Sequence, residues 1–519
     1  MKRIKPSPYV SGNTEQLIGQ DVRDILTEKG GQVEKTKQEL KEEARRRKRR
    51  TRPYFVIAYA FVFIFVALIG YLVYFNVMLK DDILSSPYNK RQNALAEYVI
   101  RGEITDTEGR VLAETRTAED GSESRSYPYG RLLAHAVGYD VRGKSGLESV
   151  ENYTLLSADN AITDRILNDL LGQKNPGDTV VSTLDVDIQK AAYEALGGYN
   201  GAVIAVEPAT GAVRAWVSKP DFDPNTLNDD WEALVSDSGN SNLVNRVSQG
   251  RYTPGSVFKI VTALAYYRTF GSFDDFHYHC TGEITEDGHT IHCAGGAVHG
   301  DLDAAGAFAQ SCNCAFVAMG QAVGADQLKK TAESLLFNAE LYSQLTINTS
   351  SFALDSESDT MELMQTSFGQ GRTTMSPYHL ALIVSAIAND GIVMKPTLIQ
   401  RIENDSGDTV KTIGPTAYTR LMTEEEAAVL KTFMTGVVKE GTGAALGGRG
   451  YEAAGKTGTA DTVNGDGSAG TNAWFVGILD PADPSLVVAV VVENGGSGAG
   501  AALPVCAAVF DAYHEKYGG

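Results

Sequence analysis

The stretch YTPGSVFKI, Tyr252–Ile260, places a hydroxyl and an amine three residues apart, directly after a Pro-Gly pair. Pro254 fixes φ and Gly255 allows a tight backbone approach, so a helix is predicted to begin near Ser256. Residues i and i+3 share one helix face, which puts Lys259 beside the Ser256 hydroxyl. N–H groups at a helix start favour an alkoxide, and burial lowers the pKa of a lysine so that it can act as a base. The stretch therefore predicts a serine nucleophile with an adjacent base, as acyl transfer requires.

Two further motifs follow in the chain. The first is SCN, Ser311 to Asn313, and the second is GKTGTA, Gly455 to Ala460, on a predicted strand. Each has an ordinary structural explanation: Ser311 and Asn313 could cap a turn, and Lys456 could be a solvated strand end. Ser-x-x-Lys, Ser-x-Asn and Lys-Thr-Gly in this order are, however, the signature of penicillin-binding proteins and serine β-lactamases.

The resemblance extends over most of the chain, from about Pro87 to the C-terminus. It is carried by the segments VNRVSQGRYTPGSVFKIVTALA (244–265), SKPDFDPN (218–225), FGQGRTTMSPYHLALIVSAIANDG (368–391), RGEITDTEGRVLAE (101–114) and GKSGLE (143–148). The last two resemble motifs in the N-terminal lobe of class B penicillin-binding proteins. The sequence is thus identified as resembling a monofunctional peptidoglycan transpeptidase of class B.

The pattern of apolar runs predicts an α/β (α+β) fold. Asp185 can cap a helix over 185–198, and GAVIAVEPATGAVRAWV (201–217) reads as a β-hairpin. Two more strands are predicted at NAWFVGIL (472–479) and SLVVAVVVE (485–493), followed by a helix over 501–517. An antiparallel sheet built from N- and C-terminal strands is therefore expected, flanked by helices and interrupted by a largely helical insertion over 230–440.

The N-terminal part predicts a membrane anchor. Residues 1–53 hold 15 basic and 8 acidic side chains, and the rest of the chain holds 31 and 57, which makes nucleic acid an unsuitable partner. The basic run ARRRKRRTR (44–52) precedes an uncharged segment over 54–79, long enough to cross a bilayer. The alternative, a cleaved signal peptide, has a shorter apolar run and a small-residue cleavage site.

Four regions are predicted from these patterns. They are a flexible, basic cytoplasmic tail (1–52), a transmembrane helix (53–79), a non-catalytic lobe of the pedestal or dimerisation type (80–185) and a transpeptidase domain (186–519) outside the cytoplasm.

The resemblance implies a role for each motif residue. Ser256 attacks the penultimate carbonyl of a stem peptide ending in D-Ala-D-Ala, Lys259 accepts its proton, and the Ser256 and Thr459 N–H groups form the oxyanion hole. Ser311 relays a proton to the departing amine, and Asn313 orients the peptide. The third motif binds the substrate carboxylate through its charge and hydroxyls, with the residues Lys456, Thr457, Gly458 and Thr459.

Differences from related enzymes narrow the range of activities that the resemblance implies. No Glu-x-x-Leu-Asn segment is present, so a β-lactam acyl-enzyme should persist, and Cys312 stands where many β-lactamases have Asp. About 105 residues, 80–185, lie between the transmembrane segment and the catalytic domain, too few for the glycosyltransferase domain of class A enzymes. The family therefore implies a SEDS-type membrane glycosyltransferase as partner, and no cofactor or metal is expected.

The segment HYHCTGEITEDGHTIHC, His277–Cys293, is chemically ambiguous. Export favours a Cys280–Cys293 disulfide. The alternatives are free thiols or a zinc site formed by His279, Cys280, His292 and Cys293. The remaining thiols, Cys312, Cys314 and Cys506, are expected to be buried.

Two other functions remain open from the sequence. The same catalytic residues serve a D,D-carboxypeptidase or β-lactamase, in which water replaces the amine acceptor. A penicillin-binding scaffold or sensor of the division or elongation machinery is the non-enzyme alternative, and the intact Ser256, Lys259, Asn313 and Lys456 argue against it.

Overall fold

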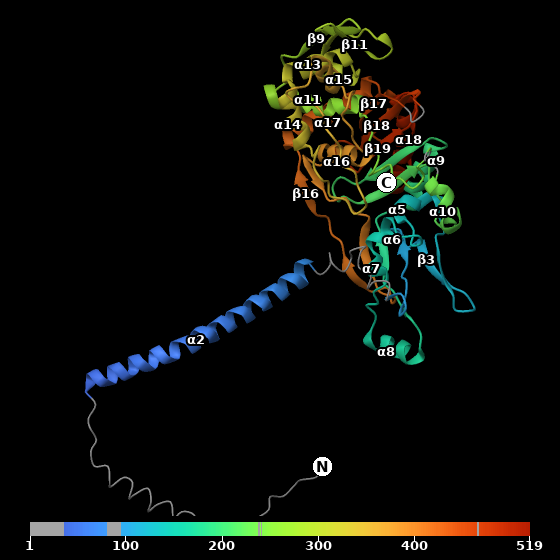
Figure 1. Ribbon diagram of the computed structural model, residues 1–519. Coiled ribbons are helices and arrows are strands. Elements are labelled where there is room, and N and C mark those ends of the chain that lie inside the picture. The colour runs from blue at the N-terminus through green and yellow to red at the C-terminus, as the bar shows by residue number, and fades with distance from the viewer. Residues whose placement is uncertain (1–35, 80–94, 237–238, 240, 464–466, 519) are drawn as a thin grey trace, which may run out of the picture. The chain divides into compact units, whose positions relative to one another are not determined.

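The computed structural model describes residues 36–79, 95–236, 239, 241–463 and 467–518 (Figure 1). The chain divides into two units, Met1–Asp82 and Ile83–Gly519. Residues 1–35 of the predicted flexible tail, and residues 87–94 at the start of the family resemblance, lie outside the described ranges.

The described part of the first unit is one long helix. Helix α2, Lys37–Tyr74, continues into the π-helical turn η1, Phe75–Leu79. Thr36 and Glu39 form a capping box at its start. Its side chains are exposed, and within the described ranges it is the one helix with the length and apolar composition to cross a membrane. It is consistent with a single-pass anchor.

An antiparallel five-stranded sheet organises the second unit. The strand order is β17-β18-β19-β7-β8, and every neighbouring pair is antiparallel. The strands are β7 Gly201–Val206, β8 Val213–Lys219, β17 Ala453–Val463, β18 Ala469–Leu479 and β19 Leu486–Val492. The predicted sheet of strands from both ends of the domain is confirmed.

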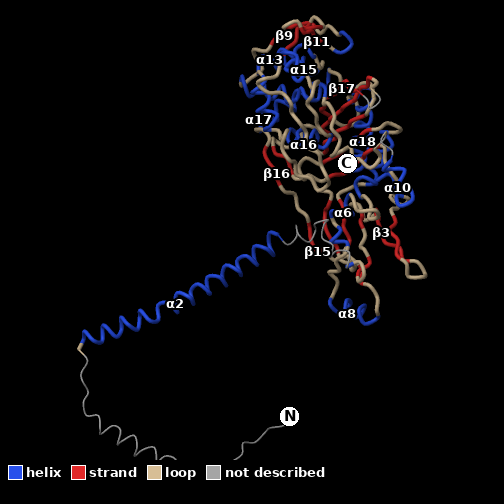
Figure 2. Tube along the Cα trace, viewed as in Figure 1, coloured by secondary structure: helices blue, strands red, loops and turns tan. Residues whose placement is uncertain are grey.

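Helices cover both faces of this sheet. Alternate residues of β19, such as Val487 and Val491, join the core cluster formed with α16, Pro377–Ala388. The intervening residues, such as Val488, join the cluster formed with α9, Val186–Leu196, and α18, Leu503–Tyr517. Figure 2 shows helices in blue next to the red strands in this part of the molecule. Because both faces are covered, β19 is buried throughout, which explains its unbroken apolar sequence.

The insertion between β8 and β17 is mainly helical, as predicted. Its other helices are α10 Leu227–Ser236, η3 Gly255–Phe258, α11 Lys259–Phe270, η4 Ala294–Gly296, α12 Ala304–Ala309, α13 Asn313–Val323, α14 Ala325–Ser334, α15 Thr360–Ser367, α17 Glu424–Glu440 and η5 Ala444–Leu446. It also holds short antiparallel ribbons that were not predicted. The paired strands are β9 His277–Cys280 with β12 Gly300–Asp303, β10 Glu283–Glu286 with β11 His289–His292, and β13 Ile392–Met394 with β16 Ala417–Arg420.

The N-terminal lobe is built around a second sheet, with the strand order β15-β14-β6-β2-β3-β4. Its strands are β2 Ile104–Thr105, β3 Val111–Thr117, β4 Glu123–Ser126, β6 Thr179–Ser182, β14 Ile399–Glu403 and β15 Thr409–Thr412, beside the pair β1 Val99–Ile100 and β5 Asn175–Pro176. Its short helices are α5 Ala134–Val137, α6 Gly146–Val150, α7 Asn152–Leu155 and α8 Ile162–Leu171. Strands β14 and β15 come from the C-terminal half, so one sheet joins the lobe to residues far along the chain.

The two lobe motifs found in the sequence meet in a buried ion cluster. Arg101 and Glu148 form a salt bridge of 2.5 Å, and Arg125 Nε lies 2.7 Å from the same carboxylate. Burial alone raises the pKa of the Glu148 carboxyl, but the two guanidinium groups outweigh it and hold that pKa below its ordinary value.

Candidate active site

A glycine turn places Ser256 against the sheet. Gly255 has φ +58, and its N–H donates to the Gly369 carbonyl at 2.8 Å. A Cβ at position 255 would lie 2.4 Å from the Thr459 carbonyl oxygen, so only glycine fits between η3 and β17. Ser256 lies in the 3₁₀ turn η3, and Lys259 is the first residue of α11. Residues i and i+3 eclipse in such a turn, so the predicted shared face is retained.

Lys259 is fully buried and faces the second motif. Its Nζ donates to the Ser311 carbonyl at 2.6 Å, to Asn313 Oδ1 at 2.8 Å and to Ser311 Oγ at 3.2 Å. Among the described residues, no hydrogen bond joins it to Ser256 Oγ. Burial lowers the pKa of Lys259 to about 7, with a smaller opposing effect from nearby cysteines. Near neutral pH this amine can therefore take up a proton.

Lys456 approaches Ser311 from β17. Its Nζ donates to Ser311 Oγ at 2.8 Å, so that one hydroxyl lies between two buried amines. Burial, and then the charge of Lys259, hold the pKa of Lys456 well below its ordinary value. No salt bridge within the described ranges joins either lysine to a carboxylate. The pair therefore favours an incoming anion, because a buried cation without a counter-ion is costly.

The start of α13 fixes the second motif. Ser311 adopts a left-handed φ of +56, and Cys312 caps the helix by accepting the Ala315 N–H at its sulfur. Asn313 Nδ2 donates to the His292 carbonyl at 3.1 Å, which ties the motif to the end of β11.

Two residues that the sequence analysis missed support the third motif. Thr442 and Thr457 share a hydroxyl hydrogen bond of 2.6 Å, and the Gly498 N–H donates to Thr459 Oγ1 at 3.3 Å. Gly458 allows close packing, since a Cβ there would lie 3.0 Å from Val257 and Trp474. The one available sequence sign was the glycine-rich character of 441–443 and 495–500.

These residues line one cleft of about 910 Å³, large enough for a peptide-sized ligand. The predicted residues in its wall are Ser256, Ser311, Asn313, Thr457, Gly458 and Thr459. Lys259 and Lys456 lie buried behind this wall and reach it through Ser311. The structure thus brings all eight predicted residues together.

The expected Cys280–Cys293 disulfide is not formed. The two sulfurs are 3.7 Å apart, beyond the length of about 2.05 Å for a disulfide, and all five cysteines are free and buried. Two of the four zinc ligands suggested by the sequence, His279 and His292, are also wrong. The His279 and His292 side chains are 66% and 65% exposed and lie beside Asp301 and Glu283.

A serine beside a buried lysine, facing a Ser-x-Asn and a Lys-Thr-Gly strand, defines the class of active-site serine acyltransferases. Residues 201–512 match the penicillin binding protein transpeptidase domain, and residues 101–180 match the penicillin binding protein A dimerisation domain. The chain therefore belongs to the penicillin-binding protein transpeptidase family, within its class B.

The PbpA proteins of two mycobacterial species match this chain over nearly their whole length. The chain is 31% identical to the peptidoglycan D,D-transpeptidase PbpA of Mycolicibacterium smegmatis, across 86% of this chain and 95% of that protein. It is 32% identical to PbpA of Mycobacterium tuberculosis, across 84% and 94%.

Solved structures share the fold. The ceftriaxone acyl-enzyme complex of M. tuberculosis penicillin-binding protein A has a TM-score of 0.74 and 29% identity, covering 80% of this chain and 99% of that one. The D,D-transpeptidase domain of a peptidoglycan glycosyltransferase from Eggerthella lenta has a TM-score of 0.72 and 31% identity, with the same coverage.

The lowered pKa of Lys259 gives a testable pH dependence. Only the neutral amine can accept a proton, so the acylation rate should rise about tenfold per pH unit below pH 7 and level off above it. Stopped-flow acylation by a chromogenic cephalosporin from pH 5.5 to 9 measures this. A flat profile, or a midpoint near the ordinary lysine value, contradicts the prediction.

Proposed function

We propose that this chain cross-links peptidoglycan as a membrane-anchored D,D-transpeptidase, with Ser256 as nucleophile and β-lactams as covalent inhibitors. The observation that carries the proposal is the Ser311 hydroxyl held between the amines of Lys259 and Lys456, 3.2 and 2.8 Å away, in the wall that contains Ser256. A stem peptide ending in D-Ala-D-Ala is the donor substrate.

Acylation begins at Ser256. Lys259 takes the hydroxyl proton while the oxygen attacks the penultimate carbonyl of the donor. The developing oxyanion is bound by the N–H groups of Ser256 and Thr459. The close packing of Gly255 against Thr459 supports this assignment, because it puts the turn and the strand at one position.

The third motif binds the donor's terminal carboxylate. Lys456 provides positive charge, and the hydroxyls of Thr457 and Thr459 are the hydrogen-bond donors. The absence of a carboxylate partner for both lysines in the described part of the chain supports this role, since the substrate brings the missing negative charge.

Ser311 returns the proton to the departing D-Ala amine. Its contact with both lysines supports a relay, because a hydroxyl can accept from one neighbour and donate to another. Asn313 orients the donor peptide. An amine of a second strand then attacks the acyl-enzyme, so Ser256 is released and one peptide bond joins the strands.

The anchor implies the setting of the reaction. The basic residues before the apolar segment hold the tail in the cytoplasm and place the catalytic domain outside it. Glycan polymerisation then requires a partner, and a SEDS-type glycosyltransferase in the membrane fills that role.

An acceptor assay tests the proposal on the full-length chain in detergent. A thioester donor is supplied with and without D-alanine, and the products of aminolysis and hydrolysis are counted. Aminolysis should dominate with the acceptor present, and fluorescent penicillin should label the enzyme covalently. Ser256→Ala should abolish both. The matched control is Ser385→Ala in α16, which removes a buried hydroxyl that has no hydrogen-bond partner among the described residues and should change neither.

The outcomes separate the alternatives. If hydrolysis of the donor remains the main reaction when D-alanine is present, the chain is a D,D-carboxypeptidase. If fluorescent penicillin does not label the wild-type chain, the enzyme hypothesis is wrong and the scaffold hypothesis is the one left.

A further inference from the structure

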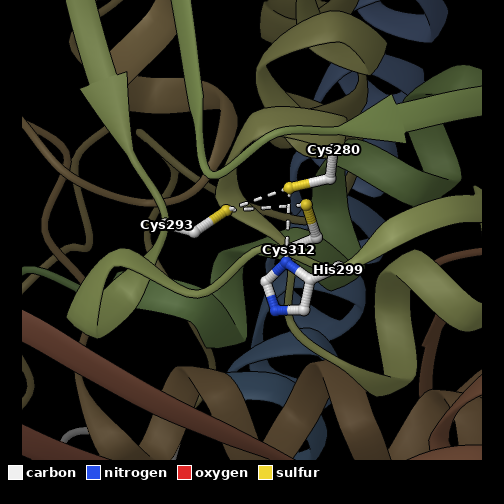
Figure 3. A group of neighbouring side chains, drawn as sticks. All are labelled: Cys280, Cys293, His299 and Cys312. Atoms are coloured by element: carbon white, nitrogen blue, oxygen red, sulfur yellow. Dashed lines mark hydrogen bonds between the residues drawn. The ribbon is translucent and has the colours of Figure 1, made fainter.

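Four side chains that bear metal-ligating atoms converge next to the cleft. They are Cys280 at the end of β9, Cys293 just after β11, His299 before β12, and Cys312 at the start of α13. Their sulfur and nitrogen atoms all lie within 4.8 Å of one another. Figure 3 shows the side chains pointing toward a common centre from four separate segments.

We infer that Cys280, Cys293, His299 and Cys312 hold a structural Zn²⁺ ion. The inference goes beyond the proposed function; the presence of the ion does not depend on that function, whereas the positioning role argued below rests on it. It replaces the earlier expectation of no metal, and it keeps two of the four ligands that the sequence had suggested.

The distances match tetrahedral zinc. Zn–S bonds of about 2.3 Å place two sulfurs of a tetrahedron about 3.8 Å apart, and Zn–N of about 2.0 Å places nitrogen and sulfur about 3.5 Å apart. Cys293 Sγ lies 3.7 Å from Cys280 Sγ and 3.6 Å from Cys312 Sγ. Cys280 Sγ lies 3.4 Å from His299 Nδ1.

Burial supports a metal over unligated thiols or a disulfide. Cys280, Cys293 and Cys312 are 0%, 3% and 0% exposed, and His299 is half-buried. A disulfide can join only two of these three buried thiols. A zinc ion takes all three as thiolates, with one proton released from each, and the imidazole completes a closed structural site.

The fifth ligand-bearing neighbour is excluded by geometry. Cys314 Sγ lies 3.3 Å from Cys293 Sγ, but it does not belong to the group whose atoms are mutually close. Its sulfur also contacts the Ile291 carbonyl oxygen, 3.9 Å away. Cys314 is therefore a neighbour of the site and not a ligand.

The metal would position the reacting groups. Cys312 stands between Ser311 and Asn313, and both of these contact Lys259 Nζ. Cys293 and His299 belong to the segment that forms one wall of the cleft. A zinc ion thus fastens that wall to the start of α13, where the second motif lies. Its role is positional, because protein atoms fill all four coordination positions.

Metal content tests the inference directly. The full-length chain is purified in detergent, dialysed against metal-free buffer and analysed by mass spectrometry, with about one zinc per chain expected. Cys293→Ser should lower the zinc content at least fivefold. Cys314→Ser should retain it, and so should the matched control Cys506→Ser, whose thiol is buried in the other core cluster.

Spectroscopy keeps the test independent of folding of the variants. Co²⁺ added to the zinc-depleted wild-type chain should give thiolate-to-metal absorption and the visible bands of tetrahedral cobalt. Zinc-depleted chain should also acylate about tenfold more slowly and recover when zinc is restored, because misplaced reacting groups lose rate steeply.

Three results overturn the inference. The first is a wild-type chain that neither contains zinc nor binds Co²⁺. The second is an equal loss of zinc in Cys314→Ser and in Cys293→Ser, which would contradict the assignment of the four ligands. The third is unchanged acylation after full depletion, which removes the positioning role. Failure of the transpeptidase assay leaves the metal content unaffected, so the two proposals fail separately.

Discussion

Replacing Lys259 with methionine is expected to slow acylation by penicillin about 10³-fold, within the usual range for loss of a general base. Methionine keeps an unbranched apolar side chain and removes the amine, which lies 5.4 Å from the centroid of the Phe316 ring. In the described ranges, Lys259 and Lys456 are the two lysines that donate to Ser311 Oγ, and only Lys259 lies on the same turn as Ser256. Single-turnover labelling with fluorescent penicillin measures the rate, and the rise through pH 7 should disappear with it.

A second buried lysine provides the matched control. Lys219 is 9% exposed, and its Nζ donates to the carbonyls of Tyr193 and Gly197 at 2.9 and 2.6 Å, away from the cleft. Lys219→Met should lower the melting temperature as Lys259→Met does, because each leaves carbonyls without donors, but should acylate normally. Acylation of a folded Lys259→Met chain within tenfold of the wild-type rate contradicts the assignment of the base.

The elements that sequence predicted well carry local, periodic patterns. The helix α9 has a capping aspartate, Asp185, which accepts from the N–H groups of Asp187 and Ile188. The strands β7, β8, β18 and β19 are apolar runs separated by turns. The three catalytic motifs were found for a different reason. Each is short and contiguous, so it can be recognised in the sequence before the fold is known.

Contacts between distant loops could not be read in this way. Strands β14 and β15 are short, and β15 is exposed along its length, so nothing in residues 399–412 indicates that they extend the lobe sheet. His299 lies in a loop and gains significance only when β9 and β12 pair beside α13. Thr442 likewise acts through a contact with Thr457 across the cleft wall.

The cysteine cluster is another contact between distant segments that the sequence could not predict. Spacing offered the pair Cys280 and Cys293, and the compartment favoured a disulfide between them. The tertiary fold adds Cys312, because the cap of α13 packs against the end of β11. A pairwise interpretation of the thiols could not anticipate a third sulfur at the same distance.

Gly255→Ala is expected to slow acylation about 10²-fold, the typical effect of moving a reacting group by about 1 Å. The added Cβ would lie 2.4 Å from the Thr459 carbonyl oxygen, which is backbone in a paired strand and cannot turn aside. The 3₁₀ turn must therefore move away from β17, and Ser256 moves with it. The left-handed φ of +58 adds about 1–2 kcal/mol of strain.

Gly271→Ala separates strain from displacement. Gly271 ends α11 with a left-handed φ of +80, and no atom of the described part of the chain lies within 4 Å of a Cβ built there. Both variants therefore have the backbone cost, and only Gly255→Ala pushes the nucleophile from the strand. Thermal unfolding should show a loss of stability in both chains, larger in Gly255→Ala because of the added clash, and stopped-flow acylation should show a rate defect in Gly255→Ala alone. Equal rate defects in the two variants would contradict the prediction, because strain at either end of α11 would then be enough to disturb Ser256. A wild-type rate in Gly255→Ala would also contradict it, because the turn and β17 would then not be held in contact.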